Sequence, residues 1–189
     1  MQSARAAVAP GVPAYLVTRP TLGSRDVDRS ALRSRIGRAV DEHRVCALFA
    51  PAGYGKTSAL TAWADSDHRR VAWLSLTAAD HHSEHLARGL STALAEFETG
   101  AAAPDGHQVL VVDDVHLVGA AAAREVLRPF VENPPAGVRL LLAGRSDPGL
   151  GLSRLRAAGD VTVLDPAELS FTAAEVLALG RAVGTGLTD

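Results

Sequence analysis

The sequence predicts an α/β fold in which helices cover both faces of a five-stranded parallel sheet. Five short apolar runs, each typical of a strand buried on both faces, recur along the chain, and stretches with helical spacing of apolar residues lie between them. Strands that alternate with helices favour parallel pairing through helical crossovers. The five predicted strands are 45–49, 71–76, 109–112, 138–143 and 161–164.

The predicted helices carry start signals. Asp28 is a candidate N-cap for a first helix whose apolar positions extend over 32–40. Thr172 and Glu175 form a capping-box pattern at the start of the last helix. The remaining helices are expected over 58–64, 83–97 and 120–131.

Composition excludes several classes of protein. The chain has 189 residues, enough for one domain with a sizeable core, and its formal net charge of -2 provides no global basic field for nucleic acid or an anionic membrane. The single cysteine, Cys46, rules out an internal disulfide, and its apolar surroundings favour a small buried hydrophobic residue. No apolar stretch reaches the roughly 20 residues that span a bilayer, so a soluble, cytoplasmic protein is expected.

A glycine-containing loop joins the first predicted strand to the helix after it. Successive backbone N–H groups in such a loop wrap an anion, and the N-terminus of the following helix adds its positive dipole end. Lys56, the only lysine of the chain, is predicted to reach the terminal phosphates of a nucleoside triphosphate, and the Thr57 hydroxyl to ligate Mg²⁺. The predicted nucleotide-binding residues are Ala50, Pro51, Ala52, Gly53, Tyr54, Gly55, Lys56, Thr57 and Ser58.

This loop departs from the standard P-loop pattern at one position. The pattern G-x-x-x-x-G-K-[ST] begins with glycine, where this chain has Ala50. The alternative interpretation is a strand-to-helix turn that contains Gly-Lys-Thr by chance. The strand before the loop and the helix after it favour the P-loop, and hence a P-loop NTPase fold that binds ATP or a close relative.

An acidic pair, Asp113 and Asp114, follows the third predicted strand. Four apolar residues that end in such a pair are typical of a Walker B strand. Asp113 is predicted to hold Mg²⁺ through water, and Asp114 to polarise the attacking water. A strand that ends in a solvated acidic turn is the alternative. Ligands of parallel sheets bind at the carboxyl ends of the strands, so we expect both carboxylates near Lys56.

Arg145 follows the fourth predicted strand. In P-loop enzymes with an extra strand between the P-loop strand and the Walker B strand, a polar residue at this position faces the γ-phosphate, and an arginine would stabilise that charge. A surface arginine is the alternative interpretation. His81 and His85 have the i, i+4 spacing of a metal site, but no further ligand is evident, and a solvated helix start is favoured.

Taken together, these stretches resemble a known family. The matching stretches are Ala50–Thr57, Val71–Leu76 with Asp80, Asp113–Leu117, Arg145–Arg156 and Leu169–Glu175. They are similar to the ATPase module of large LuxR-type transcriptional regulators of the maltose-activator class, which are signal-transduction ATPases with numerous domains. The resemblance covers roughly residues 15 to 180, and alanine is usual in this family where the chain has Ala50.

The resemblance implies roles and a domain organisation. It assigns Mg²⁺ to Thr57 and Asp113, water orientation to Asp114, and charge sensing to Arg145, and it places Arg19 near the adenine. The family continues into a winged-helix lid, a helical-repeat sensor and a helix-turn-helix, so contact with DNA is expected only through a domain outside this chain. The expected divisions are a lead-in over 1–18, a P-loop core over 19–166 and the start of a truncated helical lid over 167–189.

The expected function is therefore an ATP-binding switch module of a multidomain transcriptional regulator, with slow hydrolysis and with self-association of the parent protein as a further expectation. Two alternatives stay open. One is a small stand-alone P-loop NTPase or kinase, although no acceptor-binding motif is evident. The other is a non-catalytic, truncated relic of the regulator.

Overall fold

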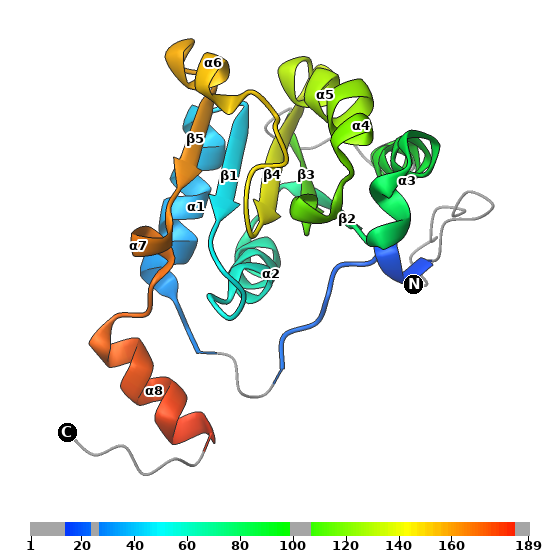
Figure 1. The fold of residues 1–189 in the computed structure, drawn as a ribbon. Coiled ribbons are helices and arrows are strands. Elements are labelled where there is room, and N and C mark those ends of the chain that lie inside the picture. The colour runs from blue at the N-terminus through cyan, green and yellow to red at the C-terminus, as the bar shows by residue number, and fades with distance from the viewer. Residues whose placement is uncertain (1–13, 24–26, 99–106, 184–189) are drawn as a thin grey trace.

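A computed structural model describes residues 14–23, 27–98 and 107–183. At its centre lies a five-stranded sheet with the order β2-β3-β4-β1-β5, in which every pair of neighbours is parallel (Figure 1). The predicted parallel sheet is therefore confirmed. The strands are β1 (Val45–Phe49), β2 (Arg70–Ser75), β3 (Gln108–Asp113), β4 (Val138–Gly144) and β5 (Val161–Leu164).

Helices cover both faces of this sheet, as predicted (Figure 1). One face packs against α1 (Ser30–Glu42), α2 (Lys56–Ser66) and the short α7 (Pro166–Leu169). The opposite face packs against α3 (Ser83–Ala95), the α4–η4–α5 helix and α6 (Leu152–Ala157). The α4–η4–α5 helix consists of α4 (Ala120–Ala122), the π-helical η4 (Ala123–Leu127) and α5 (Arg128–Glu132).

The strands supply two cores because successive side chains point to opposite faces of the sheet. In β1, Cys46 and Leu48 belong to the core under α1 and α2, whereas Val45 and Ala47 belong to the core under α3 and α5. Cys46 is fully buried, which confirms its interpretation as a core residue, and this burial raises the pKa of its thiol to about 12. A thiol with this pKa is not a nucleophile at neutral pH.

The strand order positions the candidate site. β4 lies between β1 and β3, so the P-loop strand has the sensor strand and the acidic strand on the same side, as predicted. The ladder of β1 and β4 continues into the loop, where the backbone N–H of Ala50 donates to the carbonyl of Gly144 at 3.2 Å. The carboxyl ends of β1, β3 and β4 therefore meet at one edge of the sheet.

The predicted cap of the first helix is wrong. The N-cap of α1 is Arg29, without a side-chain capping bond, and Asp28 instead forms an ion pair with Arg33 at 3.1 Å. Asp28 thus lies one residue before the N-cap, and its carboxylate pairs with a side chain of α1 and not with the first backbone N–H groups of the helix. The capping box at Thr172 and Glu175 is confirmed, because each residue accepts a hydrogen bond from the backbone N–H of the other.

The helix predicted over 120–131 is present, with a π-helical turn in its middle. The turn precedes Pro129, which has no N–H to donate and whose ring would clash with the preceding turn of a regular α-helix. A π-bulge accommodates both effects within a continuous helix.

Several short elements lie outside the predicted pattern. Residues expected in the lead-in form the 3₁₀ helix η1 (Ala14–Val17), and Val17 packs in the core against the α3 side of the sheet. The 3₁₀ helices η2 (Ala78–His81) and η3 (Val115–Leu117) follow β2 and β3. The last helix, α8 (Ala173–Val183), extends away from the sheet (Figure 1). In the part of the chain that the structure describes, none of the helices combines the length and apolar character of a membrane span.

Candidate functional site

The predicted P-loop lies between β1 and α2, where the sequence places it. Gly53 and Gly55 have φ angles of 88° and 70°, in the left-handed region that glycine adopts without strain. These two residues turn the chain back so that α2 begins at Lys56. The first N–H groups of α2 have no intrahelical acceptor and point into the loop, as an anion site requires.

Lys56 is the cation at the centre of this loop, with 8% of its surface exposed. Its Nζ atom donates to the carbonyl oxygens of Ala50 at 2.7 Å and Pro51 at 3.0 Å. Burial lowers the pKa of Lys56, and the charges of Asp113 and Asp114 oppose this shift. Phosphate oxygens are stronger acceptors for an ammonium than neutral carbonyls, so a triphosphate can displace these two bonds.

Asp113 and Thr57 form the second part of the site. The Thr57 Oγ1 hydroxyl donates to Asp113 Oδ2 at 2.6 Å, and the backbone N–H of Asp114 donates to Asp113 Oδ1 at 2.9 Å. Asp113 is buried, and this burial raises its pKa, while the Thr57 hydrogen bond opposes the shift. A buried carboxylate beside a hydroxyl fits Mg²⁺, which binds through one or two protein oxygens together with water and substrate phosphates.

Asp114 adopts a backbone conformation that is unusual for its residue type. Its φ of 60° makes it the one non-glycine residue with positive φ in the described segments. Such strained positions cluster at functional sites. His116 Nδ1 lies 3.7 Å from Asp114 Oδ1, and that nitrogen is buried without a hydrogen-bond partner. The turn Asp114–His116 packs against Gly144, where an added Cβ would lie 2.9 Å from Val115 Cγ2.

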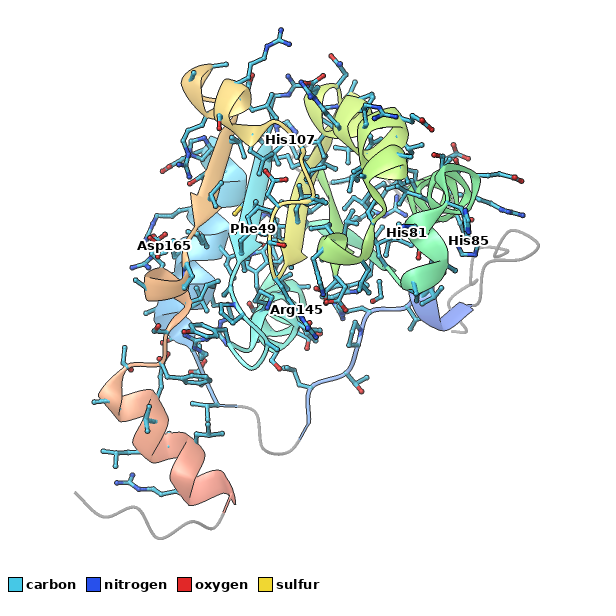
Figure 2. All side chains as sticks on the ribbon, in the orientation of Figure 1. Phe49, His81, His85, His107, Arg145 and Asp165 are labelled. Carbon is cyan, nitrogen blue, oxygen red and sulfur yellow. The ribbon has the colours of Figure 1, made fainter. Side chains whose placement is uncertain are left out.

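Arg145 is the fifth predicted site residue at the carboxyl ends of the strands, beside Lys56, Thr57, Asp113 and Asp114. It follows β4 directly and is exposed, with its side chain beyond the carboxyl end of that strand near α2 (Figure 2). Its charge contributes to lowering the pKa of Lys56, which places the two cations within electrostatic range of each other. The structure thus brings Lys56, Thr57, Asp113, Asp114 and Arg145 to one edge of the sheet.

A cavity of about 230 Å³ lies beside the P-loop helix. Its walls come from the start of α1 and the segment before it, and from the outer side of α2. Ser58, predicted as a nucleotide-binding residue, is among the lining residues, but most of the others carry no motif in the sequence. The lining includes Leu22, Val27, Arg29, Arg33, Ser58 and Ala62.

The structure places two other groups of predicted residues apart from this edge. Arg19 Nη2 forms an ion pair with Asp65 Oδ1 at 2.7 Å, and Asp65 lies eight residues after Thr57 on α2, roughly 12 Å along the helix axis. His85 Nδ1 lies 3.0 Å from Asp80 Oδ1, which gives this histidine a structural partner. Figure 2 shows His81 and His85 on the β2 side of the molecule, away from Arg145. Among the described residues, no group of three or more potential ligands suits a metal ion.

Comparison with known proteins bears on the family. The HTH-type transcriptional regulator MalT of Yersinia pestis (strain Pestoides F) is 28% identical in an alignment that covers 85% of this chain and 20% of the regulator. MalT of Yersinia enterocolitica matches at the same identity and over the same shares. The chain thus spans about a fifth of the length of these regulators. No family model matches.

Comparison with solved structures bears on the fold. A Walker-type ATPase of Pyrococcus abyssi superposes with a TM-score of 0.56 at 14% identity, over 86% of this chain and 60% of the ATPase. Together with the regulator matches, this likeness confirms two predictions: the chain has a P-loop ATPase fold, and it resembles the ATPase module of the maltose-activator class.

Proposed function

We propose that this chain is an ATP-binding module of a transcriptional regulator, in which bound ATP and Mg²⁺ set a regulatory state and slow hydrolysis resets it. DNA is contacted through another part of the regulator. The proposal is supported by the likeness to MalT, an HTH-type transcriptional regulator, and by the geometry of the sheet edge.

The observation that carries the proposal is the hydrogen bond of 2.6 Å between Thr57 on α2 and Asp113 on β3. Fifty-six positions separate these residues in the sequence, yet the fold joins them next to the ammonium of Lys56. A cation for the triphosphate and two oxygens for Mg²⁺ therefore occupy one site. This combination is typical of phosphoryl-transfer sites in P-loop proteins.

Each residue has a defined task in this proposal. Lys56 and the N–H groups at the start of α2 bind and orient the phosphates, and Thr57 with Asp113 holds Mg²⁺, which neutralises developing phosphate charge. Asp114, half-buried and in a turn that packs against Gly144, orients the attacking water and accepts its proton. Arg145 is placed to stabilise charge on the γ-phosphate.

The nucleoside is assigned to the cavity beside α2. Its lining is mainly apolar at Leu22, Val27 and Ala62, which suits a planar base, and Ser58 joins it to the phosphate loop. Arg33 adds donors at its rim for the ribose or the base.

Isothermal titration calorimetry of the 189-residue chain with ATP in Mg²⁺ buffer tests the proposal. Lys56→Ala should weaken ATP binding by about 100-fold, because the loss of a charge-assisted contact costs about 3 kcal/mol. Arg124→Ala is the matched control, since Arg124 is 72% exposed on η4 and pairs only with a surface glutamate among the contacts described.

The outcomes separate the candidate functions. Absence of ATP and ADP binding by the wild-type chain would refute the proposal and favour a non-catalytic relic. Equal affinities of wild type and Lys56→Ala would contradict the role given to the lysine. ATP turnover that rises when a small-molecule acceptor is added would favour a kinase.

A further inference from the structure

Arg29 connects parts of the chain that are far apart in the sequence. It stands at the N-cap of α1 and is only 8% exposed, although it is an arginine. Its Nη2 atom donates to the carbonyl oxygens of Leu169 at 2.8 Å and Ser170 at 3.0 Å. Its guanidinium lies 4.3 Å from the centroid of the Phe171 ring. Arg29 thus binds the segment Leu169–Glu175, hereafter the strap, which leads from α7 into α8.

The strap ends on a carboxylate that has two partners. Glu175 Oε2 accepts a hydrogen bond from the backbone N–H of Thr172 at 2.8 Å and thereby caps the first turn of α8. Its other oxygen, Oε1, lies 3.4 Å from Arg29 Nε, and the two side chains are 14% and 8% exposed. Because one carboxylate serves both contacts, the start of α8 is tied to the position of Arg29.

Arg29 also contacts the proposed nucleotide site. Its Nη1 atom donates to the carbonyl of Tyr54 within the P-loop at 3.4 Å, and its side chain lines the cavity assigned to the nucleoside. Phe171 approaches the same loop: a Cβ added at Gly55 would lie 3.9 Å from Phe171 Cζ and 3.9 Å from Arg29 Nη1. The strap therefore packs against the outside of the P-loop.

We propose that Arg29 and the strap form a latch that couples nucleotide binding to the docking of α8. This inference rests on the proposed function and adds a regulatory path to it. Four of the five N–H donors of Arg29 are engaged by protein partners, so the docked strap holds the guanidinium in place at the cavity wall.

The sign of the coupling follows from this arrangement. A nucleotide that binds when Arg29 and the P-loop are already ordered loses less conformational entropy, so docking of the strap strengthens nucleotide binding. By reciprocity, a bound nucleotide strengthens docking of the strap by the same factor. α8 extends away from the sheet, so its docking carries the state of the site to whatever packs on that helix in the regulator (Figure 1).

Hydrogen exchange of the 189-residue chain, with and without ATP and Mg²⁺, tests the latch. Bound ATP should slow exchange of the amides in the first two turns of α8 by about fivefold, the lower end of typical coupling. Glu175→Gln should remove most of this response and weaken ATP affinity by a similar factor. The glutamine oxygen still accepts from the Thr172 N–H, so the cap of α8 remains, while an NH2 group replaces the charged acceptor that faces Arg29 Nε.

Glu168→Gln is the matched control. Glu168 also caps a short helix, through a hydrogen bond to the backbone N–H of Asp165, and also pairs with an arginine, Arg35, at 3.5 Å. Its partner lies on the outer part of α1 and not in the P-loop contact, so the ATP response of α8 should survive in this variant.

The outcomes distinguish the latch from the function on which it rests. If the wild-type chain binds ATP but exchange in α8 does not change, the latch is wrong and the ATP site stands. If the wild-type chain does not bind ATP, both are wrong. A purely structural role of Glu175 would raise exchange in α8 equally with and without ATP and leave the affinity unchanged, which also overturns the latch.

Discussion

Gly144, the last residue of β4, offers a direct test of how the acidic turn is held. The turn that carries Asp114 packs against it so closely that a Cβ at position 144 would lie 2.9 Å from Val115 Cγ2 and 3.2 Å from the backbone nitrogen of His116. Carbon atoms in good contact are about 3.5–4.0 Å apart. The substitution Gly144→Ala therefore requires the turn to move by roughly 0.5–1 Å.

The expected cost has two parts. Overpacking a closely packed site costs about 1–3 kcal/mol, and for a domain of this size each kcal/mol lowers the unfolding temperature by about 2–4 °C. The same displacement moves the Asp114 carboxylate. If this group orients the attacking water, a shift on the order of 1 Å lowers the hydrolysis rate by about 100-fold.

Thermal unfolding followed by circular dichroism, together with ATP turnover, measures both parts. Gly37→Ala is the control, and its expected effect on the unfolding temperature has the opposite sign. Gly37 lies inside α1 and a Cβ there would lie 3.7 Å from Trp63 Nε1, so the substitution should stabilise the chain by up to about 1 kcal/mol through helix propensity. An unfolding temperature and a turnover of Gly144→Ala equal to those of wild type would refute the packing argument.

Substitutions at three further positions probe charge and hydrogen bonding. Asp113→Asn should raise the unfolding temperature of the nucleotide-free chain and abolish stabilisation by ATP and Mg²⁺, because burial raises the pKa of Asp113 and its charge opposes folding at neutral pH. Thr57→Val should lower the free energy of unfolding by about 1–3 kcal/mol and remove the Mg²⁺ dependence of ATP binding, whereas Thr57→Ser should preserve both in calorimetry and denaturant titrations. Asp67→Asn should cost about 1–2 kcal/mol in urea unfolding, because it removes the carboxylate of the 2.6 Å ion pair with Arg69, which keeps its ion pair with Asp41. Burial raises the pKa of Asp67, but the hydrogen bonds from Arg69 outweigh this effect and lower it below its ordinary value of 3.8. The stabilisation should therefore be complete above that pH and be lost as the pH falls through the folded-state pKa. If the variant lost equal stability at about pH 6 and about pH 2, this explanation would be contradicted.

The strands, and the position of β4 and β3 on one side of β1, could be predicted because the signals for them are local. Each of β1 to β4 contains an uninterrupted apolar run of four or more residues, which in an α/β protein fits a strand buried on both faces, whereas the run of β5 is interrupted by Thr162. The position of β4 followed from chemistry as well, since Arg145 suits the strand between the P-loop and the acidic pair. These predictions needed no knowledge of contacts between distant residues.

The role of Arg29 could not be predicted, because all the contacts that define it are made with residues far away in the sequence. Its neighbours in sequence suggested a cap at Asp28, yet its partners lie at Tyr54, Leu169 and Glu175, from 25 to 146 positions away. An arginine next to a helix start is normally solvated, and only burial by the strap distinguishes this one. The capping box at Glu175 was visible in the sequence, but its second role appears only when α8 and α1 are placed together.

Lys56 and Asp113 both have hydrogen-bond partners within the protein, and their burial still favours a charged ligand. Lys56 and Asp113 are both desolvated, which lowers the pKa of the first and raises that of the second, and each has neutral hydrogen-bond partners. Neutral partners prevent an unsatisfied buried group but do not balance a buried charge. A triphosphate alone would balance Lys56 and repel Asp113, whereas Mg²⁺ alone would do the reverse. Since the two together relieve both groups, the ligand that we propose for this edge of the sheet is the magnesium complex of the nucleotide.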